Sequence, residues 1–278
     1  MPELPEVETI RLKLLSKIVG KQIIEIKILV KKQFTGDPEK IYGAGIKAIV
    51  RHGKYLSLVL DNGFYANIHL KMTGQLLYAN DINKSKFLNK VPFVTGIMPG
   101  KTTSVIIKFH DNSGLYFNDM RKFGWVRIGR QQDRPKGPDI MSAVFTKDYL
   151  SDIAAKSKKP IKTFLLDQEK IAGIGNIYAN EILFFSGLSP ETRTDKLTGI
   201  QVKKLYQSIK AIIAKGIKYQ GSSAADEAYV LPDASRGSYQ KHFLVYQREG
   251  KQCLKCHTLI RRIKQNGRSS FYCPNCQK

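Results

Sequence analysis

The apolar residues of this chain follow two different periodicities, one in each half. In the first half, short segments rich in β-branched and aromatic residues alternate with turn signals such as Asp61-Asn62-Gly63. A series of short strands separated by turns predicts an antiparallel β-sandwich. The predicted strands are Gln22–Val30, Ile46–Val50, Tyr55–Leu60, Phe64–His69, Gln75–Tyr78, Ser104–Phe109, Gly114–Phe117 and Trp125–Ile128.

Helical spacing appears at the N-terminus and again beyond residue 147. The N-terminal helix is expected to end near Val19, and its apolar face consists of Val7, Ile10, Leu14 and Ile18. In the second half the helices are separated by proline and glycine. They are predicted over Tyr149–Ala155, Ile161–Asp167, Ile177–Ser186 and Lys196–Ile213.

Two irregular stretches suggest how the domains are divided. The polar, proline-containing segment Arg130–Asp139 predicts an interdomain linker. Residues 216–242 show little periodicity and are too numerous for an ordinary connection, so we expect a functional or disordered loop there. The predicted α+β chain comprises a sandwich domain (1–132), a linker (133–146), a helical domain with its loop (147–240) and a four-cysteine module (241–278).

The composition is strongly basic. Lys and Arg number 46 against 23 Asp and Glu, and this excess is spread along the 278 residues. A basic folded surface favours nucleic acid as the partner, while an anionic membrane surface is the weaker alternative because no basic amphipathic helix with exposed aromatics is evident. Without a long apolar run or a basic leader, we expect a cytoplasmic protein with no membrane span, associated with the nucleoid.

All four cysteines lie near the C-terminus in two pairs. Cys253-Leu-Lys-Cys256 and Cys273-Pro-Asn-Cys276 are separated by sixteen residues. This spacing predicts one structural zinc ion; two disulfides are the alternative, which a reducing cytoplasm disfavours. Four thiolates complete a tetrahedral shell and leave no position for a catalytic water, so the zinc is expected to stabilise shape. His257 is expected to be a bystander.

The N-terminal residues Pro2-Glu-Leu-Pro-Glu6 carry candidate chemistry. Removal of Met1 would expose the secondary amine of Pro2, and an α-amino group titrates near a pKa of ~8. Such an amine suits Schiff-base catalysis, with Glu3 and Glu6 transferring protons. The alternative is a simple helix start, for which proline and glutamate are also typical, and these residues alone favour that alternative.

Several residues are candidate phosphate contacts. Asn176 follows Gly173 and Gly175 at a predicted helix start, where backbone amides can bind an anion, although the asparagine could merely cap the helix. Lys54 begins a strand and Arg268 lies in a turn before the second cysteine pair. Either of these cations could instead be solvated.

Two loops could enter a duplex. Arg121 and Phe123 lie two residues apart in Asp119-Met-Arg-Lys-Phe-Gly124, so a guanidinium fork and an aromatic wedge could project together. Met72 lies in the turn of His69-Leu-Lys-Met-Thr-Gly74. The alternative for Phe123 and Met72 is a place in the core.

Taken together and in this order, these motifs resemble one family, formamidopyrimidine-DNA glycosylase, which excises oxidised purines such as 8-oxoguanine. The motifs are the N-terminal Pro2–Glu8, the two loops above, Gly173–Ala179 and the four-cysteine finger with Arg268. The resemblance implies an N-terminal β-sandwich, a helix-two-turn-helix domain and a zinc-finger β-hairpin. It also implies a monomer that binds double-stranded DNA containing a damaged base.

The resemblance further implies roles for individual residues. Pro2 would attack C1′ of the damaged nucleotide and form a Schiff base, from which β,δ-elimination cleaves the strand. Glu3 would be the acid/base partner, and Glu6 and Lys54 would support the catalytic site. For DNA binding, the resemblance implies phosphate contacts from Lys54, Asn176, Tyr246 and Arg268, a lysine near the damaged nucleotide at Lys162, and a gap-filling triad of Met72, Arg121 and Phe123.

One departure from the family pattern affects substrate choice. Where the family commonly has a string such as Gly-Thr-Thr-Leu-Arg-Asp-Phe, this chain has Gly221-Ser-Ser-Ala-Ala-Asp-Glu227, which leaves the order of lesion preference open. Two other functions are considered. One is the sister glycosylase for oxidised pyrimidines (endonuclease VIII-like), against which Leu4 argues; the other is a catalytically silent nucleic-acid-binding protein of the same fold.

Overall fold

The computed structural model describes residues 1–83, 87, 91–92, 98–223 and 229–278. They form two compact units. The first comprises Met1–Arg134 together with Tyr219–Gln240, and the second comprises Pro135–Lys218 together with Lys241–Lys278. Among the described helices, none is both long enough and apolar enough to cross a membrane.

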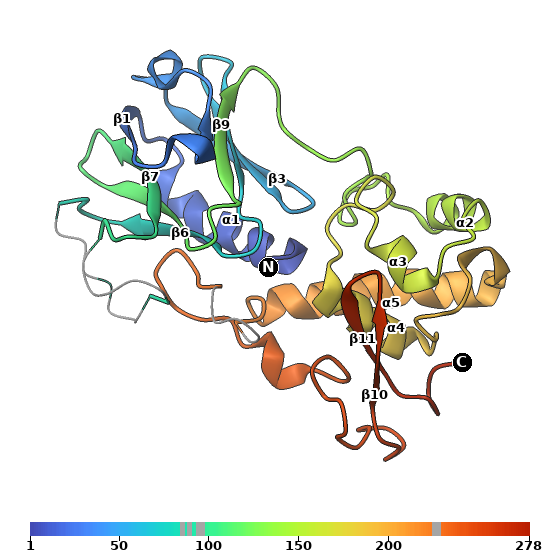
Figure 1. Ribbon diagram of the computed structural model, residues 1–278. Coiled ribbons are helices and arrows are strands. Elements are labelled where there is room, and N and C mark those ends of the chain that lie inside the picture. The colour runs from blue at the N-terminus through green and yellow to red at the C-terminus, as the bar shows by residue number, and fades with distance from the viewer. Residues whose placement is uncertain (84–86, 88–90, 93–97, 224–228) are drawn as a thin grey trace. The chain divides into compact units, whose positions relative to one another are not determined.

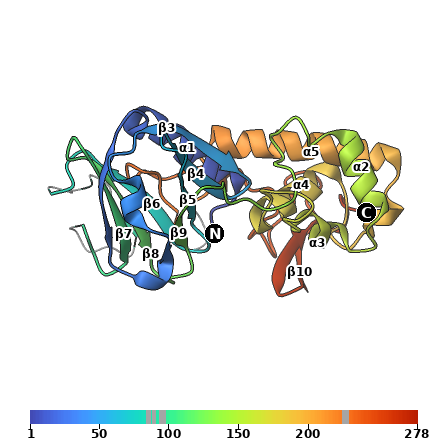
Figure 2. The ribbon, with the colours of Figure 1, turned by 90° about the horizontal axis from the view of Figure 1, so that it is seen from above.

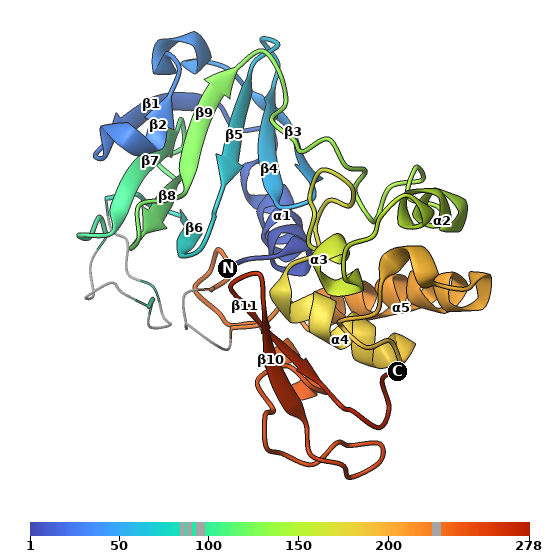
Figure 3. The same cartoon turned by 45° about the vertical axis from the view of Figure 1, so that its right-hand side comes forward.

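The first unit is a sandwich of two sheets with the order β1-β7-β8-β6 and β2-β9-β5-β4-β3 (Figure 3). Neighbouring strands pair antiparallel except β2 with β9, and every strand predicted from the sequence is confirmed. Only the two-residue β2 was not predicted, because it is too short to show a period. The strands are β1 (Ile23–Ile28), β2 (Phe34–Thr35), β3 (Ile46–His52), β4 (Tyr55–Leu60), β5 (Tyr65–His69), β6 (Gly74–Ala79), β7 (Thr103–Phe109), β8 (Gly114–Asp119) and β9 (Trp125–Gly129).

Helix α1 (Leu4–Ile18) packs on the sandwich and contacts β3, β4 and β6 (Figure 1). Its predicted apolar face is buried in the same core as both sheets: Val7, Ile10, Leu14 and Ile18 are at most 1% exposed. Burial of each such side chain stabilises the fold by about 1.5–3 kcal/mol. The packing therefore fixes the start of the chain on the sandwich.

The segment 219–240 belongs to the first unit, whereas the sequence pattern grouped it with the helical domain. Tyr229 and Leu231 are buried in the sandwich core, and the amide of Tyr78 donates to the carbonyl of Pro232 at 2.8 Å. Figure 2 shows this orange segment alongside β6. Long-range packing of this kind leaves no periodic trace in the sequence.

The second unit contains the predicted helices and a terminal hairpin. Helix α4 packs against α5 and against β11 of the hairpin. The predicted helix Lys196–Ile213 is divided in the structure, because Thr194–Lys196 form a 3₁₀ turn and α5 begins at Gly199. The elements are α2 (Lys147–Ala155), α3 (Ile161–Leu165), α4 (Asn176–Ser186), α5 (Gly199–Lys218), β10 (Arg261–Gln265) and β11 (Arg268–Tyr272). The first unit also contains 3₁₀ turns at Lys31–Gln33 and Pro38–Ile41, and the turn Tyr239–His242 lies where the chain passes from the first unit to the second.

Candidate functional site

The N-terminal carboxylates lie in the first turn of α1. Glu3 is the N-cap and Glu6 is the third helical residue, and each side chain accepts a hydrogen bond from the backbone of the other. The Glu3 amide lies 2.9 Å from Oε2 of Glu6. Both carboxylates are buried, at 2% and 1% exposure, directly after the buried Pro2. The helix start and the catalytic hypothesis are therefore compatible, because the capping box keeps both carboxylates buried in the helical turn that directly follows residue 2.

Glu6 also binds the segment that returns at residue 219. Its Oε1 accepts a hydrogen bond from the amide of Ser222 at 2.8 Å. Gly221 adopts a φ of +76°, and a Cβ there would lie 2.8 Å from the same carboxylate. The Tyr229 hydroxyl donates to the carbonyl of Gln220 at 3.0 Å. The divergent string of the sequence analysis begins here, but its residues 224–227 lie outside the described part of the chain.

Lys54 lies in a two-residue turn between β3 and β4. His52 pairs with Tyr55 across the turn, and Gly53 has a φ of +60°, which glycine tolerates. Arg51 donates to the carbonyl of Gly53 at 3.0 Å and to Oε2 of Glu8 on α1 at 2.7 Å. This bridge ties the turn that carries Lys54 to helix α1.

Glu8 is ionised in this bridge. Burial alone would raise the pKa of Glu8, but hydrogen bonds from Arg11 and Arg51 outweigh it and lower the pKa below its usual value. Glu8 could not be predicted from the sequence, because a glutamate on a helix near arginines has the same pattern as a solvated surface residue.

Met72, Arg121 and Phe123, here called the wedge residues, protrude from the sandwich. Met72 is 36% exposed in the loop between β5 and β6, and Phe123 is 54% exposed in the loop between β8 and β9. The alternative that Phe123 lies in the core is therefore wrong. The guanidinium of Arg121 lies over the Phe123 ring at 4.9 Å, and the Arg121 amide donates to Oγ1 of Thr73 at 3.0 Å. The structure thus joins the two loops through a direct hydrogen bond.

His69 ends β5 beside these loops and was not identified from the sequence. Its Nδ1 accepts a hydrogen bond from the Lys71 amide at 2.9 Å, which places the proton of the neutral ring on Nε2. Burial, together with the charges of Lys71, Lys54 and Arg127, lowers the pKa of His69 to about 3. A buried neutral imidazole among cations has no signature in a single sequence.

In the second unit, Asn176 is the first residue of α4 and does not cap it. The N-cap is Gly175, so the capping alternative is wrong. Among the described residues, Oδ1 of Asn176 is buried without a hydrogen-bond partner. An amide oxygen accepts hydrogen bonds and does not bind a phosphate, so the phosphate hypothesis rests on the side-chain NH₂ and the backbone amides at this helix N-terminus.

Tyr246 is oriented from two sides. Its ring contacts Phe243 and Phe271 edge to face, with centroids 5.2 and 5.3 Å away. Glu181 on α4, fully buried, accepts three consecutive backbone hydrogen bonds from Leu244, Val245 and Tyr246, at 2.8, 3.0 and 2.9 Å. Burial raises the pKa of Glu181, while these N–H donors act in the opposite direction.

Arg268 and Lys162 meet at the hairpin. Arg268 follows the two-residue turn Asn266-Gly267, whose φ angles of +46° and +74° fit a type I′ hairpin, and its side chain is exposed. Lys162 is only 1% exposed and donates to the carbonyl of Ser269 at 2.6 Å and to Oγ of Ser270 at 2.7 Å. Both basic residues line a pocket of about 380 Å³ between α3 and the hairpin.

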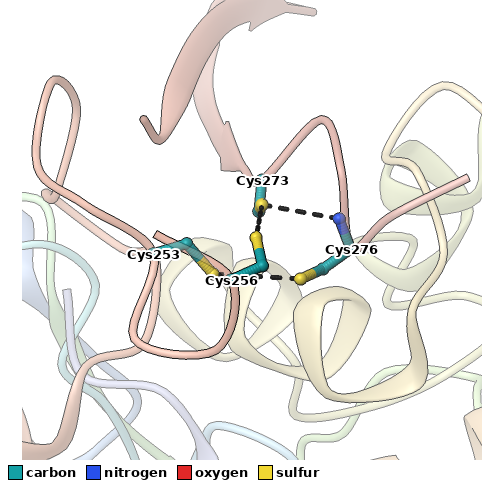
Figure 4. A group of neighbouring side chains, drawn as sticks. All are labelled: Cys253, Cys256, Cys273 and Cys276. Carbon is teal, nitrogen blue, oxygen red and sulfur yellow. Dashed lines mark hydrogen bonds between the residues drawn. The ribbon is translucent and has the colours of Figure 1, made fainter. Parts of the chain in front are cut away.

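The four cysteines converge at the base of the hairpin (Figure 4). Their sulfur atoms all lie within 4.8 Å of one another, and Cys253 to Cys276 measures 3.9 Å. A Zn–S bond of about 2.3 Å implies tetrahedral edges of about 3.8 Å, so the set fits zinc. Amides of Lys255 and Cys276 each lie 3.4 Å from a cysteine sulfur of their own pair, as in metal-binding turns. His257 is not part of this group among the described residues.

Comparisons with known proteins agree across the chain. Residues 1–126 match the formamidopyrimidine-DNA glycosylase N-terminal domain, residues 136–227 match its H2TH domain, and residues 250–278 match a zinc finger found in FPG and IleRS. The formamidopyrimidine-DNA glycosylase of Carboxydothermus hydrogenoformans is 39% identical over 287 residues, covering 100% of both chains. That of Pelotomaculum thermopropionicum is 34% identical, covering 100% of this chain and 99% of its own.

Solved structures give the same match. MutM (Fpg) of Thermus thermophilus superposes with a TM-score of 0.86 at 31% identity, covering 99% of this chain and 98% of that one. Lactococcus lactis Fpg in complex with Fapy-dG containing DNA gives 0.83 at 31% identity, covering 99% and 100%. The same protein with oxidised-pyrimidine containing DNA gives 0.83 at 32%, covering 100% of both chains.

Proposed function

This chain belongs to the formamidopyrimidine-DNA glycosylase family of bifunctional DNA glycosylases and AP lyases in base excision repair, and on that premise we propose that it removes oxidised purines through Pro2. The observation that carries the proposal is the pair of buried carboxylates, Glu3 and Glu6, in the first helical turn directly after Pro2. Once Met1 is removed, the Pro2 nitrogen is a secondary amine with acid/base groups beside it.

The proposed reaction begins at C1′ of the flipped nucleotide. The Pro2 nitrogen forms a bond to C1′ and loses its proton, and the glycosidic bond breaks as the damaged base leaves with its electron pair and takes up a proton. The C1′–O4′ bond then breaks, Glu3 in its acid form protonates O4′, and an iminium forms between Pro2 and C1′. Glu6 holds Glu3 through the backbone bond between them.

Strand cleavage follows from the iminium. Loss of a proton from C2′ expels the 3′ phosphate, which is the β-elimination, and a second proton loss expels the 5′ phosphate, which is the δ-elimination. Water then hydrolyses the remaining iminium, releases the sugar fragment as an aldehyde and regenerates Pro2. Glu3, now ionised, is the base we assign to these proton removals.

DNA binding is assigned to both units. A stacked nucleotide cannot present C1′ to Pro2, so the base must leave the helix. The wedge residues fill the space it leaves, with Arg121 facing the orphaned cytosine. Lys54 and three residues of the second unit contact phosphates around the lesion, and Lys162 supports this surface beside the nucleotide through its bonds to the hairpin. Those three residues are Asn176, Tyr246 and Arg268.

One structural Zn²⁺ stabilises the finger that carries Arg268, and the complete thiolate shell gives it no part in the chemical steps. The lesion class rests on the family and on the Lactococcus relative bound to Fapy-dG DNA, while the same relative with an oxidised pyrimidine keeps that class as a second substrate to test. We expect the protein to act as a monomer.

Borohydride trapping tests the proposal. Wild-type protein, shown by N-terminal mass analysis to lack Met1, is incubated with a duplex carrying 8-oxoguanine opposite cytosine. We expect a covalent complex that Pro2→Gly reduces by at least ~100-fold. Pro5→Ala is the matched control, because it changes a proline of the same helix start and should trap normally. Absence of a trapped species with purine, pyrimidine and abasic substrates would overturn the proposal.

A further inference from the structure

The two loops that carry the wedge residues share one buried carboxylate. These wedge loops are residues 70–73, between β5 and β6, and residues 120–124, between β8 and β9. Asp119 is the last residue of β8 and is fully buried. A buried carboxylate is costly unless hydrogen bonds satisfy its oxygens, so its partners show what it does.

Four donors converge on Asp119, and they come mostly from the wedge loops. Oδ1 accepts from the Thr73 hydroxyl at 2.5 Å and from the Arg121 amide at 3.2 Å. Oδ2 accepts from the Gly124 amide at 2.6 Å and from Nε2 of Gln33 at 3.1 Å. The carboxylate therefore bonds one loop through Thr73 and both ends of the other through Arg121 and Gly124.

Gln33 extends this network. It is 1% exposed, and its Nε2 also donates to the carbonyl of Gly124 at 2.9 Å. Its Oε1 accepts from the hydroxyl of Ser104 on β7 at 2.6 Å, which fixes the orientation of the amide. Gln33 thereby ties the end of the 120–124 loop to the sheet that contains β7 and β8.

The loop backbones need such a support. Lys71, directly before Met72, and Lys122, between Arg121 and Phe123, have φ values of +50° and +57°, which non-glycine residues rarely adopt. Strained backbone of this kind persists only where surrounding contacts determine it, and it is concentrated at functional sites. Gly124 fits closely as well, since a Cβ there would lie 2.9 Å from the carbonyl of His69.

The strand itself does not require the Asp119 side chain. The backbone of Asp119 pairs with Gly74 on β6, and its amide donates to the carbonyl of Thr102 at 2.8 Å. The carboxylate bonds are additional to this ladder and go to Gln33 and to loop atoms. This difference separates orientation of the wedge from formation of the sandwich.

We propose that Asp119, with Gln33 and Thr73, is the positioning centre of the wedge: it orients Met72, Arg121 and Phe123 together so that they enter the duplex as one unit. The inference rests on the proposed function. It predicts that damage to this centre impairs steps in which the wedge replaces a flipped base, and leaves Pro2 chemistry intact where no base has to be replaced.

Asp119→Asn is the informative variant because it keeps the shape and changes only the hydrogen bonding. The new amide NH₂ must face either Gly124 and Gln33 or Arg121 and Thr73, and on each side it meets an N–H donor. The loops are then displaced without loss of side-chain volume. A misplacement of about 1 Å at a functional group can cost about 100-fold in rate.

The matched control lies at the other end of the same strand. Asp111 precedes β8 and accepts from the amide and hydroxyl of Ser113 at 3.1 and 2.6 Å, so Asp111→Asn is the same substitution in the same hairpin. It touches neither wedge loop. Thr73→Val is a second test variant, because it removes only the hydroxyl that joins the loops and leaves Asp119 and Gln33 in place.

The experiment measures each variant on two substrates: excision of 8-oxoguanine from a duplex, and borohydride trapping on a single-stranded abasic oligonucleotide. We expect Asp119→Asn to lower duplex kcat/KM by about 10- to 100-fold, with trapping on the single strand unchanged. Thr73→Val should lower duplex excision less, and Asp111→Asn should match wild type on both. Discrimination between cytosine and adenine opposite the lesion should also narrow in Asp119→Asn, because Arg121 is misplaced.

The outcomes separate the inference from its premise. Duplex excision at the wild-type level in both Asp119→Asn and Thr73→Val would overturn the positioning role and leave the proposed function standing. An equal loss on both substrates would overturn it too, because the network would then serve only the stability of the sandwich. Wild-type protein inactive on every substrate would instead overturn the proposed function.

Discussion

The wedge loops of the first unit and the zinc finger of the second both present exposed basic side chains on a rigid base, but the base is built differently. In the finger, four sulfurs from two short turns converge within 4.8 Å. In the wedge loops, one carboxylate gathers donors from Gln33, Thr73, Arg121 and Gly124. A metal site can form from local residues, whereas the carboxylate centre exists only after the sandwich has folded.

The comparison also shows that zinc is not the sole support of the second unit. Glu181 accepts three consecutive amides from the segment that carries Tyr246, much as Asp119 does for the wedge loops. Buried carboxylates that bind loop amides therefore occur in both units. Removal of the zinc or of a buried carboxylate, one at a time, measures how far each region depends on metal binding and how far on hydrogen bonds to the carboxylate.

The largest effect is expected from zinc removal. Structural zinc contributes about 10–16 kcal/mol of binding free energy in small finger domains, so chelation should unfold the finger and abolish tight DNA binding. The single tryptophan, Trp125, lies on β9 of the first unit and is stacked by Arg127 at 4.1 Å. Its fluorescence should therefore stay native while DNA affinity, measured by anisotropy, is lost.

Zinc add-back is the control for this experiment and should restore binding. If metal-stripped protein bound and cleaved DNA normally, the structural role assigned to zinc would be wrong. If Trp125 fluorescence changed together with DNA binding, the independence of the two regions would be refuted.

The second effect is expected from Glu181→Gln. The new amide can accept at one end only, so at least one buried N–H of residues 244–246 faces a donor, at a cost of about 1–3 kcal/mol. We expect a lower melting temperature for the second unit and weaker DNA binding, with zinc content unchanged by metal analysis. Glu191→Gln, an exposed glutamate of the same unit, is the control. Unchanged affinity and melting would show that zinc alone orients Tyr246.

The smallest effect concerns pH and the first unit. The pKa of His69 is about 3 in the folded chain, against an ordinary 6.5. At a pH between these two values, the imidazole is therefore protonated in the unfolded state and neutral in the folded state. Stability therefore decreases as pH falls through this window, by about 1 kcal/mol between pH 7 and 5.5. Urea unfolding followed by Trp125 fluorescence should show this loss in wild type and not in His69→Gln. If the stability of both proteins depended equally on pH, the pH dependence would arise from titratable groups other than His69.

Much of the fold could be read from local patterns. The predicted strands and the N-terminal helix are confirmed because alternation and helical spacing report which face of each element is buried. The zinc site could be predicted in the same way, because two residues separate the cysteines within each pair. The sequence did not predict long-range packing. The 219–240 segment belongs to the same unit as the sandwich because Tyr229 and Leu231 are buried in the sandwich core.

For the candidate site too, the sequence predicted which side chains are present but not their long-range contacts. The sequence identified Pro2, Glu3 and the wedge residues as types of side chain suited to their chemistry, and it identified the segments in which they lie. It could not show that Phe123 is exposed, that Glu8 and Arg51 bridge α1 to the Lys54 turn, or that Gly175 rather than Asn176 caps α4.

By itself, the sequence determined the order of the main elements, the four cysteines of the zinc site, the basic character and the candidate residues for the proposed Schiff-base chemistry. The tertiary structure alone decided which groups support them. Glu6 meets the amide of Ser222, 216 positions away, and Asp119 meets Gln33, 86 positions away. The physical reason is that periodicity and short motifs record interactions between near neighbours, whereas a buried carboxylate finds its donors only when the packed core brings distant segments together.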